Sequence, residues 1–277
     1  MAMLDTGVND LIGRIEGSVA VLSFNRPEAR NALSDEIFLG FSNTLPRIAD
    51  DPSIRVLMVT GEGGAFCSGG DVKGMNRNNQ ASAGADTKRP SLEAHVAGLR
   101  AKQNQVSLAL RNLPKPVVAA LPGPAAGAGL SIAFAADLRI AAERAFLFTA
   151  FSNIGASGDF GTSWFLPRIV GEAKAKELMF LSPRLTSHEA KDLNIVNAVL
   201  PDEDFADAAV TWCQVLADRA PIALRYMKEN VNRSLDVGLQ QALDAEATAM
   251  VRTMSTADHM EAALAFVEKR SPRFKGE

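Results

Sequence analysis

The stretch VVAALPGPAAGAGLSIAFAA, Val117 to Ala136, runs for twenty residues without a charged side chain. Its length alone would be enough for a helix that spans a membrane. Proline and glycine at 122–124 interrupt the stretch, and proline cannot continue a helix because it lacks a backbone N–H. The stretch therefore predicts a short buried strand, VVAAL, and a small-residue helix, GAGLSIAFAAD, with no membrane span.

Strands and helices alternate on both sides of this stretch. Residues 10–24 read as a β-hairpin with a turn at Gly17-Ser18, and residues 55–61 (RVLMVTG) read as a buried strand. Ser34 is a good N-cap for an amphipathic helix, and residues 91–112 predict a further helix. The apolar positions of the helix after Ser34 are Ile37, Phe38, Phe41, Leu45 and Ile48. The recurrence of strand, helix and strand predicts an α/β fold with crossover connections.

Two segments differ in composition from the rest. Residues 74–90 contain almost no apolar side chains and predict a mobile loop. After Pro201 only helical patterns follow, so we expect a core at 1–201 and a helical oligomerisation subdomain at 202–277. The expected helices are 202–219, 221–233, 236–253 and 256–268. Their apolar positions should pack partly on the chain's own core and partly on another subunit: Leu224, Met227, Val231, Leu235, Leu239, Leu243, Met250, Met254 and Met260.

Charge and composition exclude several classes of function. The 277 residues carry a net charge of −3, so binding to nucleic acid or to an anionic membrane is not expected. Cys67 and Cys213 lie far apart and predict neither a disulfide nor a zinc site. The three histidines are widely separated, so no metal site is expected. The sequence also lacks the glycine-rich loop that binds nucleotide phosphates. The N-terminal residues lack the features of a secretory signal, which favours a cytoplasmic location.

Two glycine-rich turns each follow an apolar strand: FCSGGD at 66–71 and GPAAGAGLS at 123–131. Small residues let backbone N–H groups approach a ligand closely, and the N-terminus of a helix adds a partial positive charge. Two such turns on neighbouring strands can direct two amides at one oxygen, as stabilisation of an oxyanion requires. Either turn taken alone is also compatible with a simple tight connection. The segment around Ser131 loosely resembles the nucleophile turn of a serine hydrolase, but it lacks the second glycine of that motif. None of the histidines has a sequence context that identifies it as a partner base.

One carboxylate stands apart in IGASGDFGTSWF, residues 154–165. Asp159 lies among glycines, small hydroxyls and aromatic residues, with no basic side chain until Arg168. Burial beside Phe160 and Trp164 would raise its pKa toward the range that a proton shuttle needs. The alternative is that Asp159 only caps a helix beginning near Phe160, since aspartate is a favoured N-cap.

Several segments together resemble the crotonase (enoyl-CoA hydratase/isomerase) superfamily in their order and spacing. They are NRPEARNALS, AFCSGGD, KPVVAALPGPAAGAGLSIAFAADLRIA, WFLPRIVG, LTSHEAKDLNIVNAVLP and FVEKRSPRFKGE. The resemblance covers nearly the whole chain. It implies an α/β fold with a spiral of ββα turns, a C-terminal helical trimerisation region, and a homotrimer or dimer of trimers. It also implies an acyl-CoA thioester substrate whose thioester oxygen lies between the backbone amides of Ser68 and Ala128.

The resemblance extends to residues that would contact the substrate. Ala29, Arg30, Gly69, Gly70 and Asp71 match positions that contact CoA in relatives. Lys269 matches a basic residue that reaches a CoA phosphate from an adjacent subunit. For Arg30 and Lys269 a solvated surface charge is the alternative. CoA is part of the substrate, so no separate cofactor is expected.

The departures from the family pattern bear on the reaction. Ser131 and Phe151 stand where hydratases of this family carry two glutamates, and neither side chain can act as a general base alone. We expect both residues to contribute to substrate binding instead. Asp159 matches an aspartate that acts in some isomerases and dehalogenases of the family, although Phe151 and Asn104 replace the tryptophan and histidine of the dehalogenases. We therefore expect an isomerase-type proton shift that uses Asp159 alone. The alternatives are a hydratase, another lyase or hydrolase, and a family member that binds acyl-CoA without turning it over.

Overall fold

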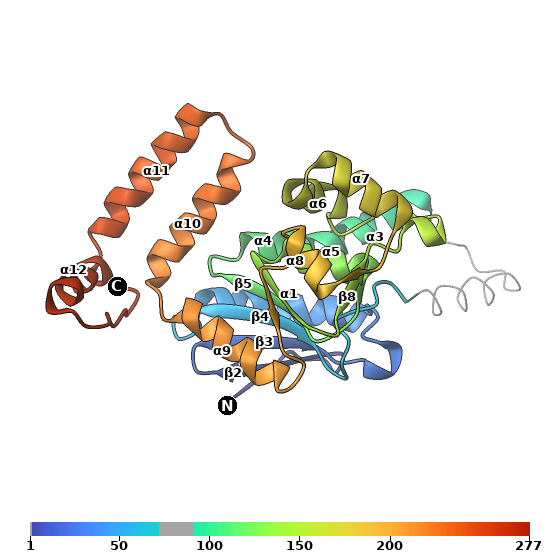
Figure 1. The fold of residues 1–277 in the computed structure, drawn as a ribbon, viewed down its shortest axis with the longest axis horizontal. Helices are drawn as coiled ribbons and strands as arrows, with labels where there is room; N and C mark the ends of the chain where they lie inside the picture. The colour runs from blue at the N-terminus through green and yellow to red at the C-terminus, as the bar shows by residue number, and fades with distance from the viewer. Residues whose placement is uncertain (1, 72–90) are drawn as a thin grey trace, which may run out of the picture.

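A seven-stranded sheet forms the centre of the protein in a computed structural model, which describes residues 2–71 and 91–277 (Figure 1). The strands lie in the order β1, β2, β3, β4, β5, β7, β10. The first three are antiparallel and the remainder parallel. Their bounds are β1 Ala2–Leu4, β2 Leu11–Glu16, β3 Val19–Phe24, β4 Val56–Gly61, β5 Val117–Leu121, β7 Leu138–Ala142 and β10 Ala198–Leu200. The hairpin expected at 10–24 is thus confirmed as β2 and β3. The loop expected at 74–90 lies outside the described residues.

A second, smaller sheet lies across the ends of the parallel strands. It consists of β6 Ala125–Ala126, β8 Phe146–Phe148 and β9 Leu185–Thr186, and Cys67 joins it through an isolated bridge to Ala125. The chain thus adds a long strand to the first sheet and a short extended segment to the second in each turn of the spiral. The ββα spiral expected from the resemblance is confirmed.

The stretch 117–136 folds as its proline and glycine residues predict. β5 ends at Leu121, and α5 occupies Gly127–Ala135 with every residue buried. Among the described residues, no helix combines the length and the apolar character that crossing a membrane would need.

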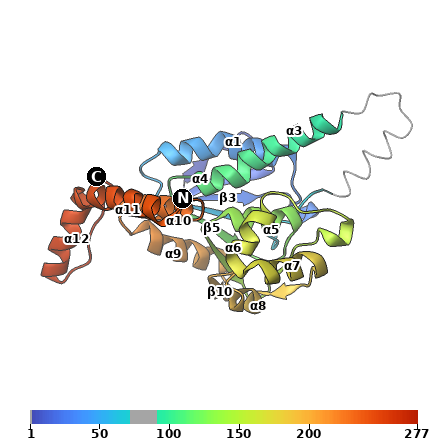
Figure 2. The same ribbon diagram turned by 90° about the horizontal axis from the view of Figure 1, so that it is seen from above.

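Helices cover both faces of the large sheet (Figure 2). On one face lies α1, Asp35–Asp50, which the Ser34 hydroxyl caps by accepting from the Ile37 amide at 3.4 Å. The helix expected at 91–112 is confirmed as α3 Leu92–Gln103, a π-helical turn at 104–108 and α4 Ala109–Asn112. α9, Phe205–Ala217, covers the opposite face. Three further helices complete this part: α6 Thr162–Val170, α7 Glu172–Leu181 and α8 Ser187–Asp192.

Successive strand residues enter two different cores, because side chains alternate across a sheet. In β3, Ala20 and Leu22 pack toward α1, whereas Val19 and Val21 pack toward α9. The same alternation runs through β4 and β5. This double burial explains why the central strands are apolar at nearly every position.

The last three helices extend away from the sheet (Figure 1): α10 Pro221–Ser234, α11 Leu239–Met254 and α12 Ala257–Glu268. Lys228 anchors α10 to the core, donating to Asp137 Oδ2 at 2.8 Å and to the carbonyl oxygens of Lys115 and Leu110 at 3.1 and 3.2 Å. The helices expected after residue 201 are confirmed. Because α9 packs on the sheet, only the helices from Pro221 onward project from it, and the expected division at residue 201 stays a prediction.

Gly129 provides a test of the packing between α5 and the first glycine-rich turn. A Cβ at this position would lie 2.6 Å from Cys67 Sγ and 2.5 Å from the Cys67 carbonyl oxygen. Gly129→Ala should therefore lower the free energy of unfolding by about 1–3 kcal/mol, despite the better helix propensity of alanine. Gly98→Ala is the matched control in α3, where nothing lies within 4 Å of the added methyl, and it should gain about 0.5–1 kcal/mol. Urea unfolding of both variants checks this, and equal stability of the two would contradict the packing.

Candidate active site

The two glycine-rich turns meet at the N-terminus of α5. The Ala126 amide donates to the Cys67 carbonyl oxygen at 2.9 Å, and the Phe66 amide donates to the Pro124 carbonyl oxygen at 3.0 Å. These bonds align the turn at 66–71 with the turn at 123–131. The close approach of Gly129 to Cys67 follows from this alignment.

The Ala128 amide lies in the first turn of α5, where backbone N–H groups have no acceptor within the helix. Gly127 begins the helix with a left-handed φ of 51°. Gly69 faces this position, since a Cβ on Gly69 would lie 3.2 Å from the Ala128 nitrogen. The absence of a side chain at Gly69 therefore leaves space beside the Ala128 amide for a ligand oxygen.

The Ser68 amide occupies the neighbouring turn and donates to the Arg30 carbonyl oxygen at 3.0 Å. The Ser68 hydroxyl donates to the Ala29 carbonyl oxygen at 3.3 Å, and the Leu33 amide donates to the Gly69 carbonyl oxygen at 2.9 Å. The structure thus brings the segment with Ala29 and Arg30 onto the segment with Ser68 and Gly69. A thioester oxygen bound to the Ser68 amide would share or replace its bond to Arg30.

Two polar side chains that the sequence analysis did not identify, Asn31 and Arg26, hold this loop in place. Asn31 is fully buried, accepts from the Arg26 amide at 2.9 Å, and donates to the carbonyl oxygens of Glu62 and Ala65 at 2.9 and 2.8 Å. The Arg26 guanidinium pairs with the Asp71 carboxylate at 3.6 Å. This ion pair links the segment that follows Gly70 to the segment that precedes Ala29. The sequence does contain a signal for this turn, because asparagine adopts left-handed backbone conformations more often than most residues. Asn31 has such a conformation, with a φ of 57°.

Asp159 lies on the turn before α6, in a largely buried position. Burial raises the pKa of its carboxyl from the ordinary 3.8 to about 6. Its Oδ1 atom is buried and has no hydrogen-bond partner among the described residues. The capping interpretation is wrong, because α6 begins at Thr162 after Gly161, and the backbone carbonyl of Asp159 accepts from the Thr162 amide at 3.1 Å. The carboxylate itself remains available for chemistry.

Ser131 and Phe151, which replace the family's two glutamates, are both buried. The Ser131 side chain is fully buried and donates to the Gly127 carbonyl oxygen at 3.1 Å. The Phe151 ring lies about 4.0 Å from where a Cβ on Gly127 would stand and 3.8 Å from that of Gly158. Phe151 therefore fills the space between the start of α5 and the turn that carries Asp159, and it makes that space apolar.

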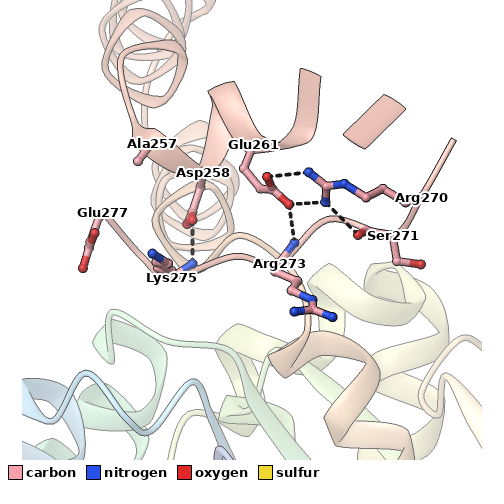
Figure 3. A pocket seen from close by; sticks show the side chains of 8 residues that line it. All are labelled: Ala257, Asp258, Glu261, Arg270, Ser271, Arg273, Lys275 and Glu277. Atoms are coloured by element: carbon pink, nitrogen blue, oxygen red, sulfur yellow. Dashed lines mark hydrogen bonds and ion pairs between the residues drawn. The ribbon is translucent and has the colours of Figure 1, made fainter. Parts of the chain in front are cut away.

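Lys269 is the one expected site residue that the structure does not bring to this cluster. It ends α12 with a left-handed φ of 56°, and α12 lies at the far end of the molecule from α5 (Figure 1). A cavity of about 760 Å³ lies beside it, between α12 and the C-terminal segment. Figure 3 shows that two of its carboxylates have partners: Glu261 pairs with the Arg270 guanidinium, and Asp258 accepts from the Lys275 backbone amide. In the residues described, no three His, Cys, Asp or Glu side chains gather as metal ligands.

The family model described as "Enoyl-CoA hydratase/isomerase" matches residues 14–277. The chain belongs to the enoyl-CoA hydratase/isomerase family. It is therefore an enzyme of a family that acts on CoA thioesters, and the crotonase resemblance read from its motifs is confirmed.

Curated relatives in the enoyl-CoA hydratase/isomerase family include enzymes of both kinds. The chain is 34% identical over 266 residues to 1,2-epoxyphenylacetyl-CoA isomerase of Escherichia coli, covering 96% of this chain and 98% of that protein. It is 33% identical over 264 residues to mitochondrial methylglutaconyl-CoA hydratase of Rattus norvegicus, covering 94% and 80%. A crystal structure of an enoyl-CoA hydratase from Polaromonas sp. JS666 matches with a TM-score of 0.87 and 33% identity, covering 95% and 99%.

The raised pKa of Asp159 makes the stability of the chain depend on pH in a defined direction. At pH values below 3.8 the carboxyl is protonated whether folded or unfolded, so it costs nothing. Between pH 3.8 and about 6 the unfolded chain has released this proton while the folded chain keeps it, so the free energy of unfolding falls over this range and levels off above it. Replacing the carboxyl by a neutral amide removes this loss. Asp159→Asn should therefore exceed wild type in unfolding free energy by about 1–2 kcal/mol at pH 8, after allowance for partial solvent screening, and by little at pH 4.

Urea unfolding at both pH values checks this expectation. Asp192→Asn, at an exposed helix end, is the matched control for removal of a carboxylate and should give no such gain. A variant Asp159→Asn that is less stable than wild type at pH 8 would show that the carboxylate has partners and is not held unpaired.

Proposed function

We propose that this protein is an enoyl-CoA isomerase-type enzyme in which Asp159 alone moves a proton between carbons of a CoA-linked acyl chain. The observation that carries the proposal is the state of Asp159: its carboxyl is largely buried and has a pKa of about 6, and its Oδ1 has no hydrogen-bond partner within residues 2–71 and 91–277. An acid–base group is most effective when its pKa lies near the operating pH, because it must both take and return a proton. An unpaired carboxylate can do so without first breaking a hydrogen bond.

The amides of Ser68 and Ala128 would stabilise the enolate that forms when the proton leaves. Ala128 has an amide with no acceptor within its helix, and Gly69 leaves space beside it. The partial positive charge at the start of α5 adds to this stabilisation. The Ser68 amide would exchange its Arg30 partner for the thioester oxygen. Proton transfer within the substrate requires no separate cofactor, because CoA is part of the substrate itself.

Hydration is the less favoured reaction because it needs a positioned water and a group to activate it. The Ser131 hydroxyl is fully buried and bonded within the protein, and Phe151 offers no polar atom. Neither residue can perform the acid–base function of the glutamate that the crotonase resemblance implies at its position in the hydratases. The name of the Escherichia coli relative, an isomerase, agrees with the proposal, whereas that of the rat relative, a hydratase, does not decide between the two reactions.

Isotope exchange tests the proposed reaction. In D₂O the wild type should incorporate deuterium into at least one member of a panel of enoyl-, dienoyl- and aryl-acyl-CoA thioesters, read by mass spectrometry. Asp159→Asn should slow this exchange by roughly 10²–10⁴-fold, since it removes the only proposed acid–base group. Asp192→Asn, which removes an exposed carboxylate, should exchange at the wild-type rate.

The competing functions give different results in the same experiment. A wild type that exchanges no proton with any thioester but binds acyl-CoA would be a binding protein. Hydration that survives in Asp159→Asn would assign the chain to the hydratases and remove the role of Asp159.

We further propose that the protein assembles as a trimer or a dimer of trimers in the cytoplasm. Met227, Val231 and Leu235 on α10 are 61, 64 and 46% exposed in the single chain. α11 and α12 continue the exposed apolar surface with Leu239, Leu243, Met250, Met254 and Met260. So much apolar surface is unusual for a monomer and typical of a subunit interface. In such an assembly Lys269, at the end of α12, would act on a neighbouring subunit's CoA.

Analytical ultracentrifugation tests the assembly. The wild type should sediment as a trimer or hexamer, and Val231→Glu should shift it toward the monomer because a charge would be buried in the interface. Arg233→Glu, two residues away on the same helix at an exposed polar position, is the matched control and should leave the assembly intact. A wild-type monomer would contradict this part of the proposal.

A further inference from the structure

The turn that carries Asp159 has a strained backbone. Phe160, the next residue, has a left-handed φ of 48° although it is aromatic and only 3% exposed. Such a conformation is strained for a residue other than glycine and persists only where the surroundings impose it. The contacts around Phe160 and Asp159 therefore indicate what imposes it.

On one side, Ser107 holds the carbonyl of Phe160. Its hydroxyl donates to the Phe160 carbonyl oxygen at 2.9 Å across 53 residues of sequence, and both residues are buried. Ser107 lies in the π-helical turn at 104–108, a local widening of the helix often found at functional sites. The Phe160 ring stacks on Phe38 of α1 with centroids 5.7 Å apart and planes nearly parallel, which fixes the side chain as well.

On the other side, two hydroxyls connect Asp159 to the start of α5. Thr162 Oγ1 donates to the Asp159 carbonyl oxygen at 3.2 Å and also contacts Ser131 Oγ, which donates to the Gly127 carbonyl oxygen at 3.1 Å. Each hydroxyl has one proton, so only two of these three contacts are hydrogen bonds at any moment. When Thr162 donates to Asp159, Ser131 can donate either to Thr162 or to Gly127. The connected path runs from the residue before Ala128 to the residue proposed to carry the proton.

Resting on the proposed function, we propose that Ser107, Ser131 and Thr162 are positioning residues that hold the strained Asp159–Phe160 turn at a fixed place relative to the α5 amides. The carbonyl groups of Asp159 and Phe160 are gripped from opposite sides by Thr162 and Ser107, so the turn cannot relax to a right-handed conformation without losing a bond. The carboxylate itself receives none of these bonds. The hydroxyls thus fix the position of Asp159 through its backbone, while its buried Oδ1 has no partner in the part of the chain that the structure describes.

This assignment gives Ser131 a different role from the glutamate it replaces in the hydratase pattern. Its hydroxyl contacts the Gly127 carbonyl oxygen and the Thr162 hydroxyl, and the side chain is fully buried. Ser131 therefore connects the turn that carries Asp159 to the start of α5, which carries the Ala128 amide. We expected a substrate-binding role for Ser131, and that role stays untested.

Isosteric removal of the hydroxyls tests the proposal through the deuterium-exchange assay. Thr162→Val and Ser107→Ala should each lower the exchange rate at saturating thioester by roughly 10–100-fold, because a displaced carboxylate meets the acyl carbon poorly. The thioester concentration giving half the maximal rate should change by less than about twofold, since the amides and the CoA contacts remain. Thr162→Ser retains the hydroxyl and should retain most of the wild-type rate.

Ser187→Ala is the matched control for loss of a buried hydroxyl. Ser187 is fully buried and donates to the Glu143 carbonyl oxygen at 2.9 Å, at the start of α8. It should lower the melting temperature as the test variants do and leave the saturated exchange rate unchanged. A control that loses the rate equally would show that general loosening, not positioning, explains the test variants.

Failure of this inference is separable from failure of the proposed function. If Asp159→Asn is inactive while folded Thr162→Val or Ser107→Ala keeps more than about half of the wild-type rate, the positioning role is wrong and the proton-shuttle role stands. If Asp159→Asn is as active as wild type, the proposed function fails whatever the hydroxyl variants do.

Discussion

The contact between Gly129 and Cys67 is the constraint on which the candidate site depends. There is no room for a Cβ between α5 and the first glycine-rich turn, so the two backbones pack directly on one another. The bridge from Cys67 to Ala125 and the bond from the Ala126 amide set their register. Because this register is fixed by main-chain atoms, the amides of Ser68 and Ala128 are brought to neighbouring turns whatever side chains surround them.

The position of Asp159, the proposed acid–base group, depends in contrast on side chains. Asp159 owes its raised pKa to burial, and it stands on a turn whose carbonyl groups are held by hydroxyls from two distant segments. Phe151 fills the region between that turn and the start of α5. A site with one buried carboxyl and an apolar neighbour favours moving a proton within the substrate over activating water.

Local signals in the sequence were sufficient for most of the fold. The hairpin at 10–24, the Ser34 cap and the break at Pro122 each depend on neighbouring residues, and each is confirmed. The motifs also brought Ser68, Gly69 and Ala128 to one place. The residues around Asp159 were equally compatible with a helix-capping role for its side chain. Only the observed start of α6 at Thr162, with Gly161 at the N-cap position, excludes that role. The bond from Ser107 to Phe160 joins residues 53 apart, and no local pattern predicts it.

A crystal structure with a bound, unreactive acyl-CoA analogue tests the central claim most directly. The account predicts that the thioester oxygen lies about 2.7–3.1 Å from both the Ser68 and the Ala128 nitrogens. It also predicts that an Asp159 carboxylate oxygen stands about 3–3.5 Å from a carbon of the acyl chain. A thioester oxygen bound elsewhere, with the Ser68 amide still donating to Arg30, or an acyl chain that passes beyond reach of Asp159, would contradict it.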